Sequence, residues 1–225
     1  ISCSLVGSEM CIRDRYIINS AMDGRQYIYG AQLGLSYKIN DWLSVFAGGR
    51  MNYFSGGYEG FLDAKLIPEL GGSQLANIEL DCDQTGWGLT PIIGADVKFG
   101  KWNFAAKYEF KTNMNIENKT HKIDVNPVEA EPLLAPYKDG VNTPSDIPSL
   151  LTIAAGYEIL PTLRASVEYH FYDDKSAGMA EGRQKYLTKG ANEYLAGIEW
   201  DATKQLTISG GYQNTCLLYT SPSPR

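Results

Sequence analysis

The sequence is poor in the residues that disulfide frameworks, metal centres and nucleic-acid surfaces require. It has four cysteines and two histidines among 225 residues, which gives neither a disulfide scaffold nor a cysteine-based metal signature. Its 20 Lys and Arg residues are outnumbered by 26 Asp and Glu, for a net charge of −6, so no nucleic-acid partner is indicated. It also lacks any apolar run near the ~20 residues of a membrane-spanning helix.

The two ends of the sequence differ from everything between them. One possible codon set for Cys216–Arg225, read on the complementary DNA strand, encodes V-G-S-E-M-C-I-R-D, which is the sequence of Val6–Asp14. Such an inverted repeat is typical of a translated sequencing adapter. We therefore expect 1–15 and 216–225 to be artefacts, and 16–215 to be a fragment of a longer protein. Cys82 is then the one remaining cysteine.

Residues 16–215 are rich in glycine and tyrosine and alternate in polarity with a period of two. In 102–117, one set of positions is apolar and the set between them is polar: Trp102, Phe104, Ala106, Tyr108, Phe110 and Met114 against Asn103, Lys107, Glu109, Lys111, Asn113 and Asn115. This pattern predicts a β-strand with one apolar face. It recurs in eight predicted strands, which are 27–39, 42–54, 86–99, 102–117, 149–159, 163–172, 191–200 and 205–213.

The connections between these predicted strands alternate in length. Short turns fall near 40, 100, 161 and 202, and long segments fill 55–84, 118–147 and 174–190. An up-and-down sheet then has its short turns at one end and its long loops at the other, as outer-membrane barrels do. Aromatic residues gather at both strand ends: Tyr37, Trp42, Phe99, Trp102, Tyr157 and Trp200 at one, Tyr27, Tyr53, Trp87, Phe110, Phe171 and Tyr212 at the other.

These features decide between two all-β folds. A soluble β-sandwich also alternates in polarity, but its strands average ~5–6 residues and it needs no aromatic girdles. A tilted strand that crosses a membrane needs ~9–11 residues. The sequence therefore predicts an all-β, antiparallel, up-and-down transmembrane β-barrel, of which about eight strands are present.

Several stretches resemble one family of such barrels. The stretches Q-L-G-L-S-Y-K-I-N-D-W-L-S-V-F-A-G-G-R-M-N-Y at 32–53, K-Y-E-F-K-T at 107–112, D-I-P-S-L-L-T-I-A-A-G-Y-E at 146–158 and P-T-L-R-A-S-V-E-Y-H-F-Y-D-D at 161–174 are similar to the outer-membrane long-chain fatty acid and toluene transporters of the FadL/TodX type. The resemblance rests on the order of many stretches over 25–213 and not on one diagnostic motif.

The resemblance implies a monomeric, 14-stranded barrel in the outer membrane of a Gram-negative cell, surrounded by membrane lipid and lipopolysaccharide. It implies transport of hydrophobic small molecules, such as long-chain fatty acids or aromatic hydrocarbons, without enzyme activity or cofactor. A ligand would enter at a groove between outer loops and leave through a lateral gap in the wall. Segments 55–84 and 118–147 would then correspond to the groove-forming loops.

Both of these segments contain apolar residues where water-facing polar ones are expected. We predict a ligand-binding groove from Phe61, Leu62, Leu66, Ile67, Leu133 and Leu134, because exposed apolar patches often mark binding sites. The alternative is that the two segments pack on each other as a lid.

The polar strand faces carry charges of both signs. Arg50, Lys107 and Arg164 are the candidate ligands for the carboxylate of an acidic substrate. The alternative, which the polar lumen of a barrel favours, is that they pair with inward carboxylates and stiffen the wall.

Other chemistry is weakly indicated. Ser166 and His170 share a strand face but lie about 13 Å apart at ~3.3 Å per residue, too far for a nucleophile and its base. Glu79, Asp81 and Asp83 alternate, which suits a solvated acidic strand better than a Ca²⁺ loop. No catalytic residue and no metal site are predicted. The functional alternatives are a general porin for hydrophilic solutes and a structural or adhesin barrel.

Overall fold

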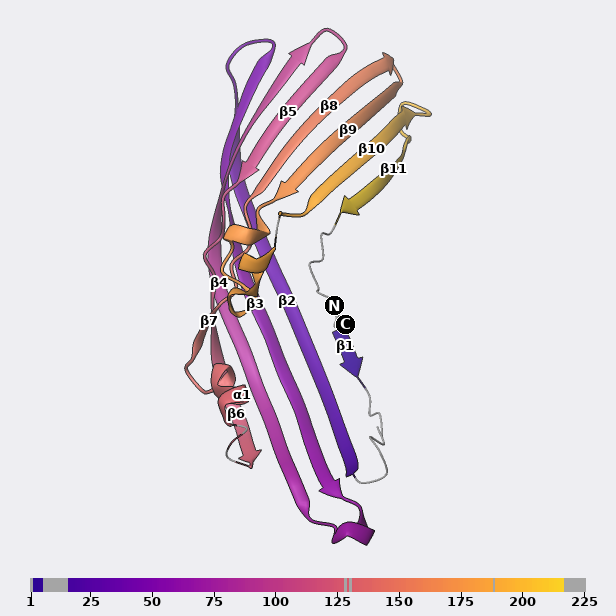
Figure 1. Ribbon diagram of the computed structural model, residues 1–225. Coiled ribbons are helices and arrows are strands. Elements are labelled where there is room, and N and C mark those ends of the chain that lie inside the picture. Colours follow the sequence, from indigo (N-terminus) through magenta and orange to yellow (C-terminus); the bar gives the residue numbers. More distant parts are fainter. Residues whose placement is uncertain (1, 6–15, 128, 130, 188, 217–225) are drawn as a thin grey trace. The chain divides into compact units, whose positions relative to one another are not determined.

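The computed structural model describes residues 2–5, 16–127, 129, 131–187 and 189–216. Within them the chain forms eleven strands that belong to one sheet, and every strand pair with a determined register is antiparallel. Hydrogen-bonded neighbours follow the order β1-β2-β3-β4-β5-β8-β9-β10-β11, with β6 beside β4 and β7 beside β6 (Figure 1). No helix among these residues has the length and apolar character needed to cross a membrane.

The eight predicted strands are present in the predicted order. They correspond to β2 (Tyr16–Lys38), β3 (Leu43–Leu66), β4 (Gln74–Phe99), β5 (Trp102–Glu109), β8 (Leu150–Leu160), β9 (Leu163–Tyr172), β10 (Asn192–Asp201) and β11 (Thr207–Cys216). The four short turns lie where they were predicted, between β2 and β3, β4 and β5, β8 and β9, and β10 and β11. The all-β, antiparallel, up-and-down prediction is therefore confirmed.

The prediction of a loop over 55–84 was wrong. β3 continues to Leu66 and β4 begins at Gln74, so most of this segment is a hairpin arm closed by η1 (Pro68–Leu70). Gly71 and Gly72 follow with φ angles of 99° and 62°, which glycine adopts at no steric cost. The arm was missed because the two faces exchange character beyond Tyr53, where the even positions become apolar and the odd positions become charged.

The predicted strand 102–117 is two strands. β5 ends at Glu109, and β6 (Asn115–Asn126) pairs with residues 77–87 of β4. After β6 come α1 (Glu131–Leu134), η3 (Ala135–Tyr137) and β7 (Asn142–Pro144). Alternation through residues 110–114 is interrupted only by Thr112, so local polarity gives little sign that the chain changes partner there.

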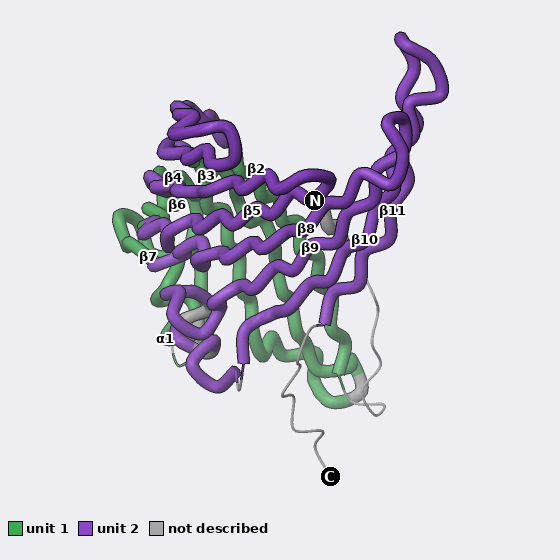
Figure 2. The backbone as a smooth tube through the Cα atoms, turned by 90° about the horizontal axis from the view of Figure 1, so that it is seen from above, with its two compact units in different colours: residues 1–29, 52–87, 115–143 green, residues 30–51, 88–114, 144–225 purple. Residues whose placement is uncertain are grey.

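The chain divides into two compact units, coloured separately in Figure 2. Unit 1 comprises residues 1–29, 52–87 and 115–143, and unit 2 comprises 30–51, 88–114 and 144–225. β2, β3 and β4 contribute to both, and the divisions fall beside Tyr29, Tyr53 and Trp87. These are the aromatic positions beyond which the odd-numbered faces of the strands become charged.

Unit 1 has a small apolar core on the even face of its strands. Phe54, Leu80, Cys82 and Ile116 are all buried there. The segment after η3 is fixed to β6 by backbone and side-chain hydrogen bonds, including Gly140 N to Asn118 O at 2.9 Å and Thr120 N to Asp139 Oδ1 at 3.0 Å. The ring of Tyr137 packs edge-on against Tyr58, 5.9 Å between centroids.

Unit 2 contains the short-turn halves of β2, β3 and β4 together with β5 and β8 to β11. Its connection from β9 to β10 holds η4 (Asp174–Ser176) and η5 (Ala180–Tyr186). Asp146 fixes this connection, because its carboxylate accepts the N–H of Gly178 at 2.9 Å and the ammonium of Lys111 lies 3.3 Å away.

The terminal segments were expected to make few contacts with the sheet. Ser2–Leu5 form β1, whose backbone pairs with Met22–Arg25 of β2, so for these four residues the expectation was wrong. Cys216 likewise belongs to β11 and pairs with Asn192. Residues 6–15 and 217–225 lie outside the described part of the chain.

Candidate functional site

One face of the sheet in unit 2 exposes its large apolar side chains. The period of two predicts that six apolar residues of these strands share one face, which in a barrel would meet lipid: Leu33, Val45, Ile93, Phe104, Ile153 and Val167. Five of them have exposed fractions from 46 to 85%, and Val45 is half-buried. We call this surface the apolar face. Soluble sheets pack such side chains into a core and rarely leave so many together in water. The described residues therefore do not form the packed core that a soluble sandwich requires.

The opposite surface of unit 2, the polar face, carries the predicted cations and their partners. Lys107 of β5 lies directly opposite Thr152 of β8, and Thr152 lies opposite His170 of β9. His170 in turn lies opposite Glu193 of β10. Directly paired residues of an antiparallel ladder share a face, so these side chains form one polar row across four strands.

Arg50 and Lys107 share a single buried carboxylate. Glu109 is only 6% exposed, and its Oε2 accepts from Arg50 Nη1 at 2.8 Å while its Oε1 lies 2.7 Å from Lys107 Nζ. Arg50 also donates through Nε and Nη2 to Gln32 Oε1, at 3.0 and 2.8 Å. Two of the three cations predicted to bind a ligand acid therefore already have a carboxylate partner.

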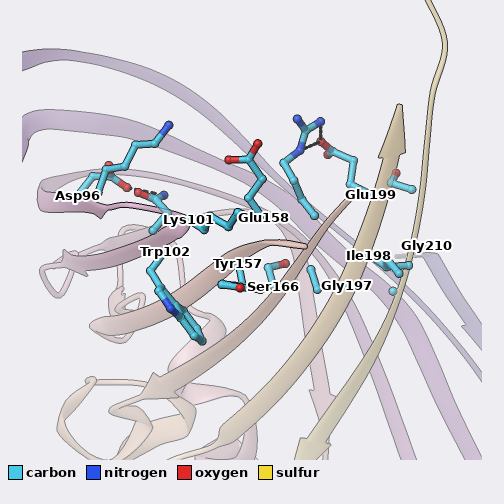
Figure 3. A pocket seen from close by; sticks show the side chains of 17 residues that line it. Asp96, Lys101, Trp102, Tyr157, Glu158, Ser166, Gly197, Ile198, Glu199 and Gly210 are labelled. Atoms are coloured by element: carbon cyan, nitrogen blue, oxygen red, sulfur yellow. Dashed lines mark hydrogen bonds and ion pairs between the residues drawn. The ribbon is translucent and has the colours of Figure 1, made fainter. Parts of the chain in front are cut away.

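Arg164 is also paired, in a different part of the polar face. Its guanidinium contacts Glu199 and lies 3.0 Å from Asp201 Oδ1. It borders a hollow of about 820 Å³ whose wall includes the small residues Gly156, Ser166, Gly197 and Gly211. Figure 3 shows Glu158 and Glu199 on one side of the sheet and the Trp102 ring on the other.

His170 lies between two carboxylates. Its Nδ1 is 3.3 Å from Glu193 Oε2 and its Nε2 is 3.4 Å from Glu168 Oε2. Glu193 also accepts from the hydroxyls of Tyr172 at 3.2 Å and Thr215 at 2.9 Å. From the sequence, His170 is a poor partner for Ser166 and a polar residue of the lumen; its neighbour Glu193 was not predicted, because a cross-strand neighbour cannot be read from spacing along one strand.

Phe46 is an apolar side chain on the polar face, and the sequence analysis did not list it. A Cβ atom placed on Gly34 would lie 2.3 Å from its ring, and one on Gly48 would lie 2.9 Å from it. The ring therefore rests on backbone that only glycine leaves free. The signal was available, since Phe46 occupies an even position of β3 two residues before a glycine.

The predicted groove residues are not gathered on one surface. Phe61 and Leu62 are consecutive in β3 and so face opposite sides. Phe61 lines a hollow of about 480 Å³ with Asp23, Glu79 and Lys122 among its walls.

The remaining groove residues lie elsewhere in unit 1. Leu66 ends β3, Ile67 precedes η1, and Leu134 ends α1. The side chain of Leu133 lies outside the described part of the chain.

Two of the three alternating acidic residues of β4, Glu79 and Asp83, are paired with basic residues. Lys122 Nζ lies 2.7 Å from Glu79 Oε2, and His121 Nε2 lies 3.1 Å from Asp83 Oδ2. The hydrogen bond from His121 holds the pKa of Asp83 below its usual value. In the described ranges no cluster of His, Cys, Asp or Glu is suited to a metal ion.

The comparisons with known proteins were made by sequence and by structure. No protein-family model matches the chain, and no curated protein matches it significantly. Four chains of solved structures match it, and three of them have TM-scores from 0.51 to 0.58. The toluene transporter TbuX of Ralstonia pickettii has a TM-score of 0.58 at 12% identity, covering 91% of this chain and 67% of its own.

The other two of these three matches are similar in extent. A FadL homologue of Pseudomonas aeruginosa has a TM-score of 0.57 at 16% identity, and the P. putida toluene transporter TodX one of 0.51 at 11%. They cover 90 and 92% of this chain but only 57 and 65% of their own length. The chain therefore has the fold of the FadL-type β-barrel transporters, and it spans 57–67% of the length of these three.

Proposed function

We propose that this chain is part of an outer-membrane channel that carries hydrophobic small molecules, such as long-chain fatty acids, aromatic hydrocarbons or similar lipids. The observation that carries the proposal is the contrast between the two faces of unit 2. The apolar face exposes aliphatic and aromatic side chains that only a lipid environment would stabilise. The polar face is lined with paired charges, as the lumen of a barrel is.

The membrane boundary in this proposal lies at the aromatic positions of β2, β3 and β4. Trp87 is 67% exposed on the same face as Leu89 and Ile93, and beyond it this face carries Asp81 and Asp83. Aromatic side chains prefer the interface between hydrocarbon and water. The charged parts of β2, β3 and β4 beyond these positions would therefore lie outside the hydrocarbon layer, at the level of lipopolysaccharide head groups and beyond.

In the proposed mechanism, apolar residues of unit 1 capture the ligand before it enters the barrel. Burial of apolar surface contributes ~25 cal/mol per Å², so an alkyl or aryl group binds without any charged contact. Phe61 and Leu62 offer two different capture surfaces, because they face opposite sides of β3. Leu66 shares the face of Leu62 on β3, and Ile67, Leu133 and Leu134 are proposed to contribute to capture from the segments around η1 and α1.

Uptake by cells tests this function. Cells that lack their own transporter would express the full-length protein and receive labelled dodecanoate, labelled toluene or a labelled sugar. We expect faster entry of at least one of the two hydrophobic compounds. Faster entry of the sugar alone would establish a general porin instead, and no change for any solute would favour a structural or adhesin barrel.

Two variants separate the two capture surfaces. Phe61→Ser and Leu62→Ser alter neighbouring residues of one strand by a similar loss of apolar area, so each serves as the control for the other. Capture on the face of Leu62 predicts slower uptake for Leu62→Ser and unchanged uptake for Phe61→Ser. Unchanged uptake in both would contradict capture by unit 1.

A further inference from the structure

The polar face has no surplus of positive charge where the predicted cations lie. The permanent cations around the row from Lys107 to Glu193 are Arg50 and Lys107, and the three carboxylates are Glu109, Glu168 and Glu193. His170 lies between Glu168 and Glu193. A ligand carboxylate placed here would add a fourth negative group against two positive ones. Repulsion between the ligand carboxylate and these neighbouring carboxylates would disfavour binding in a partly desolvated site.

Lys107 nevertheless keeps more unused hydrogen-bonding capacity than Arg50 does. Arg50 uses Nε, Nη1 and Nη2 on Gln32 and Glu109. The ammonium of Lys107 has three N–H donors, and its contact among the described residues is the 2.7 Å one to Glu109. Its side chain is 42% exposed, so the spare donors are accessible.

The neighbour of Lys107 on the polar face has an unsatisfied hydroxyl. Thr152 lies directly opposite Lys107 on one side and His170 on the other. Its Oγ1 is shut off from solvent and has no hydrogen-bond partner among the described residues. A buried polar atom without a partner costs free energy in the unliganded state, and a ligand that reaches it recovers that cost. Lys107, on its flexible and half-exposed stem, is the adjoining side chain that can move to admit one.

An apolar surface lies on the other side of Lys107 in the same row. Gly94 of β4 is opposite Lys107 and has no side chain. A Cβ placed on Gly94 would lie 3.7 Å from the Cβ of Phe46. The row therefore begins at the aromatic Phe46, crosses the backbone of Gly94 and ends at the Lys107 ammonium and the Thr152 hydroxyl. This order suits a molecule with an apolar body and a polar end.

We propose that this row selects an apolar ligand with one neutral oxygen, such as an alcohol, a phenol or a ketone, over the corresponding carboxylate. The oxygen accepts from Lys107 and bonds the Thr152 hydroxyl, and the apolar body lies over Gly94 against Phe46. This inference rests on the proposed function, because it assumes that hydrophobic molecules reach the polar face.

Three ligands of matched size test the selection. The full-length protein in lipid nanodiscs would be titrated calorimetrically with toluene, 4-methylphenol and 4-methylbenzoate at pH 7.5, with empty nanodiscs as the blank. At this pH a phenol, whose pKa resembles that of tyrosine at about 10, is neutral, and the benzoate is ionised. We expect 4-methylphenol to bind about 5- to 10-fold more tightly than 4-methylbenzoate, the worth of roughly one hydrogen bond.

Variants of the row identify the contacts. Thr152→Val removes the hydroxyl at constant shape and should weaken 4-methylphenol about 5-fold without changing toluene. Thr152→Ser keeps the hydroxyl and is the matched control. Glu109→Gln removes one carboxylate and should strengthen 4-methylbenzoate, because Arg50 and Lys107 then carry uncompensated charge.

The outcomes separate this inference from the function on which it rests. If 4-methylbenzoate binds as tightly as 4-methylphenol, or if Thr152→Val leaves 4-methylphenol unchanged, the selection is refuted while toluene binding upholds the proposed function. If none of the three ligands binds to protein that migrates as a folded barrel, both proposals fail together.

Discussion

Replacing Glu109 with Gln should destabilise the protein, because this one carboxylate neutralises two cations. Its side chain is 8% exposed, and those of Arg50 and Lys107 are 33 and 42% exposed. Removing one partner of a fully buried ion pair costs ~3–5 kcal/mol, since the other charge stays desolvated. Here the cations are partly hydrated and glutamine retains one acceptor, so we expect a loss of about 1–3 kcal/mol in the free energy of unfolding.

The matched control is Glu199→Gln. It removes the same charge from another arginine pair of the polar face, but Glu199 and Arg164 are 47 and 46% exposed, and exposed ion pairs contribute little. Equilibrium unfolding in urea, followed by circular dichroism on full-length protein in lipid vesicles, would measure both. The argument requires a clearly larger loss for Glu109→Gln. Equal losses in the free energy of unfolding for the two variants would refute the view that burial of the shared carboxylate makes Glu109→Gln the more destabilising change.

Three further predictions concern the backbone, the effect of pH and the ends of the chain. Gly48→Ala should destabilise the sheet, because the new Cβ would lie 2.6 Å from the carbonyl oxygen of Leu33. Gly210→Ala is the control and should leave stability unchanged, because its Cβ would meet nothing within 4 Å. The midpoints of urea unfolding of the two variants measure the difference. The low pKa of Asp83 stabilises the folded state above its usual pKa of about 4, and this stability is lost as the pH falls through the lower folded value. Urea titrations between pH 6 and 3 should show this loss, and His121→Ala should reduce it to the part that the neighbouring Arg25 contributes. Resequencing the gene from uncontaminated DNA should replace both terminal segments with unrelated residues, and recovery of the same ends would show that they are native.

The period of two was enough to predict the class of fold. Apolar positions such as Phe104 and Ile153 repeat at every second residue, and β9 spans the predicted residues 163–172. Short turns close strands at predicted positions because turn formation depends on a few adjacent residues. The order of the stretches also gave the resemblance, which the fold comparison supports although no more than 16% of aligned residues are identical.

The sequence by itself thus determined the eight predicted strands and which of their residues share a face, because alternation is a local property of the chain. Only the tertiary structure decided the partners: β6 pairs with β4, Arg50 and Lys107 converge on Glu109, and the Thr152 hydroxyl has no hydrogen-bond partner among the residues that the structure describes. Pairing between strands joins residues tens of positions apart, and a pattern with a period of two fits any neighbouring strand equally well. The charges of the polar face could be listed from the sequence, but whether each was free for a ligand or held by a neighbour depended on that pairing.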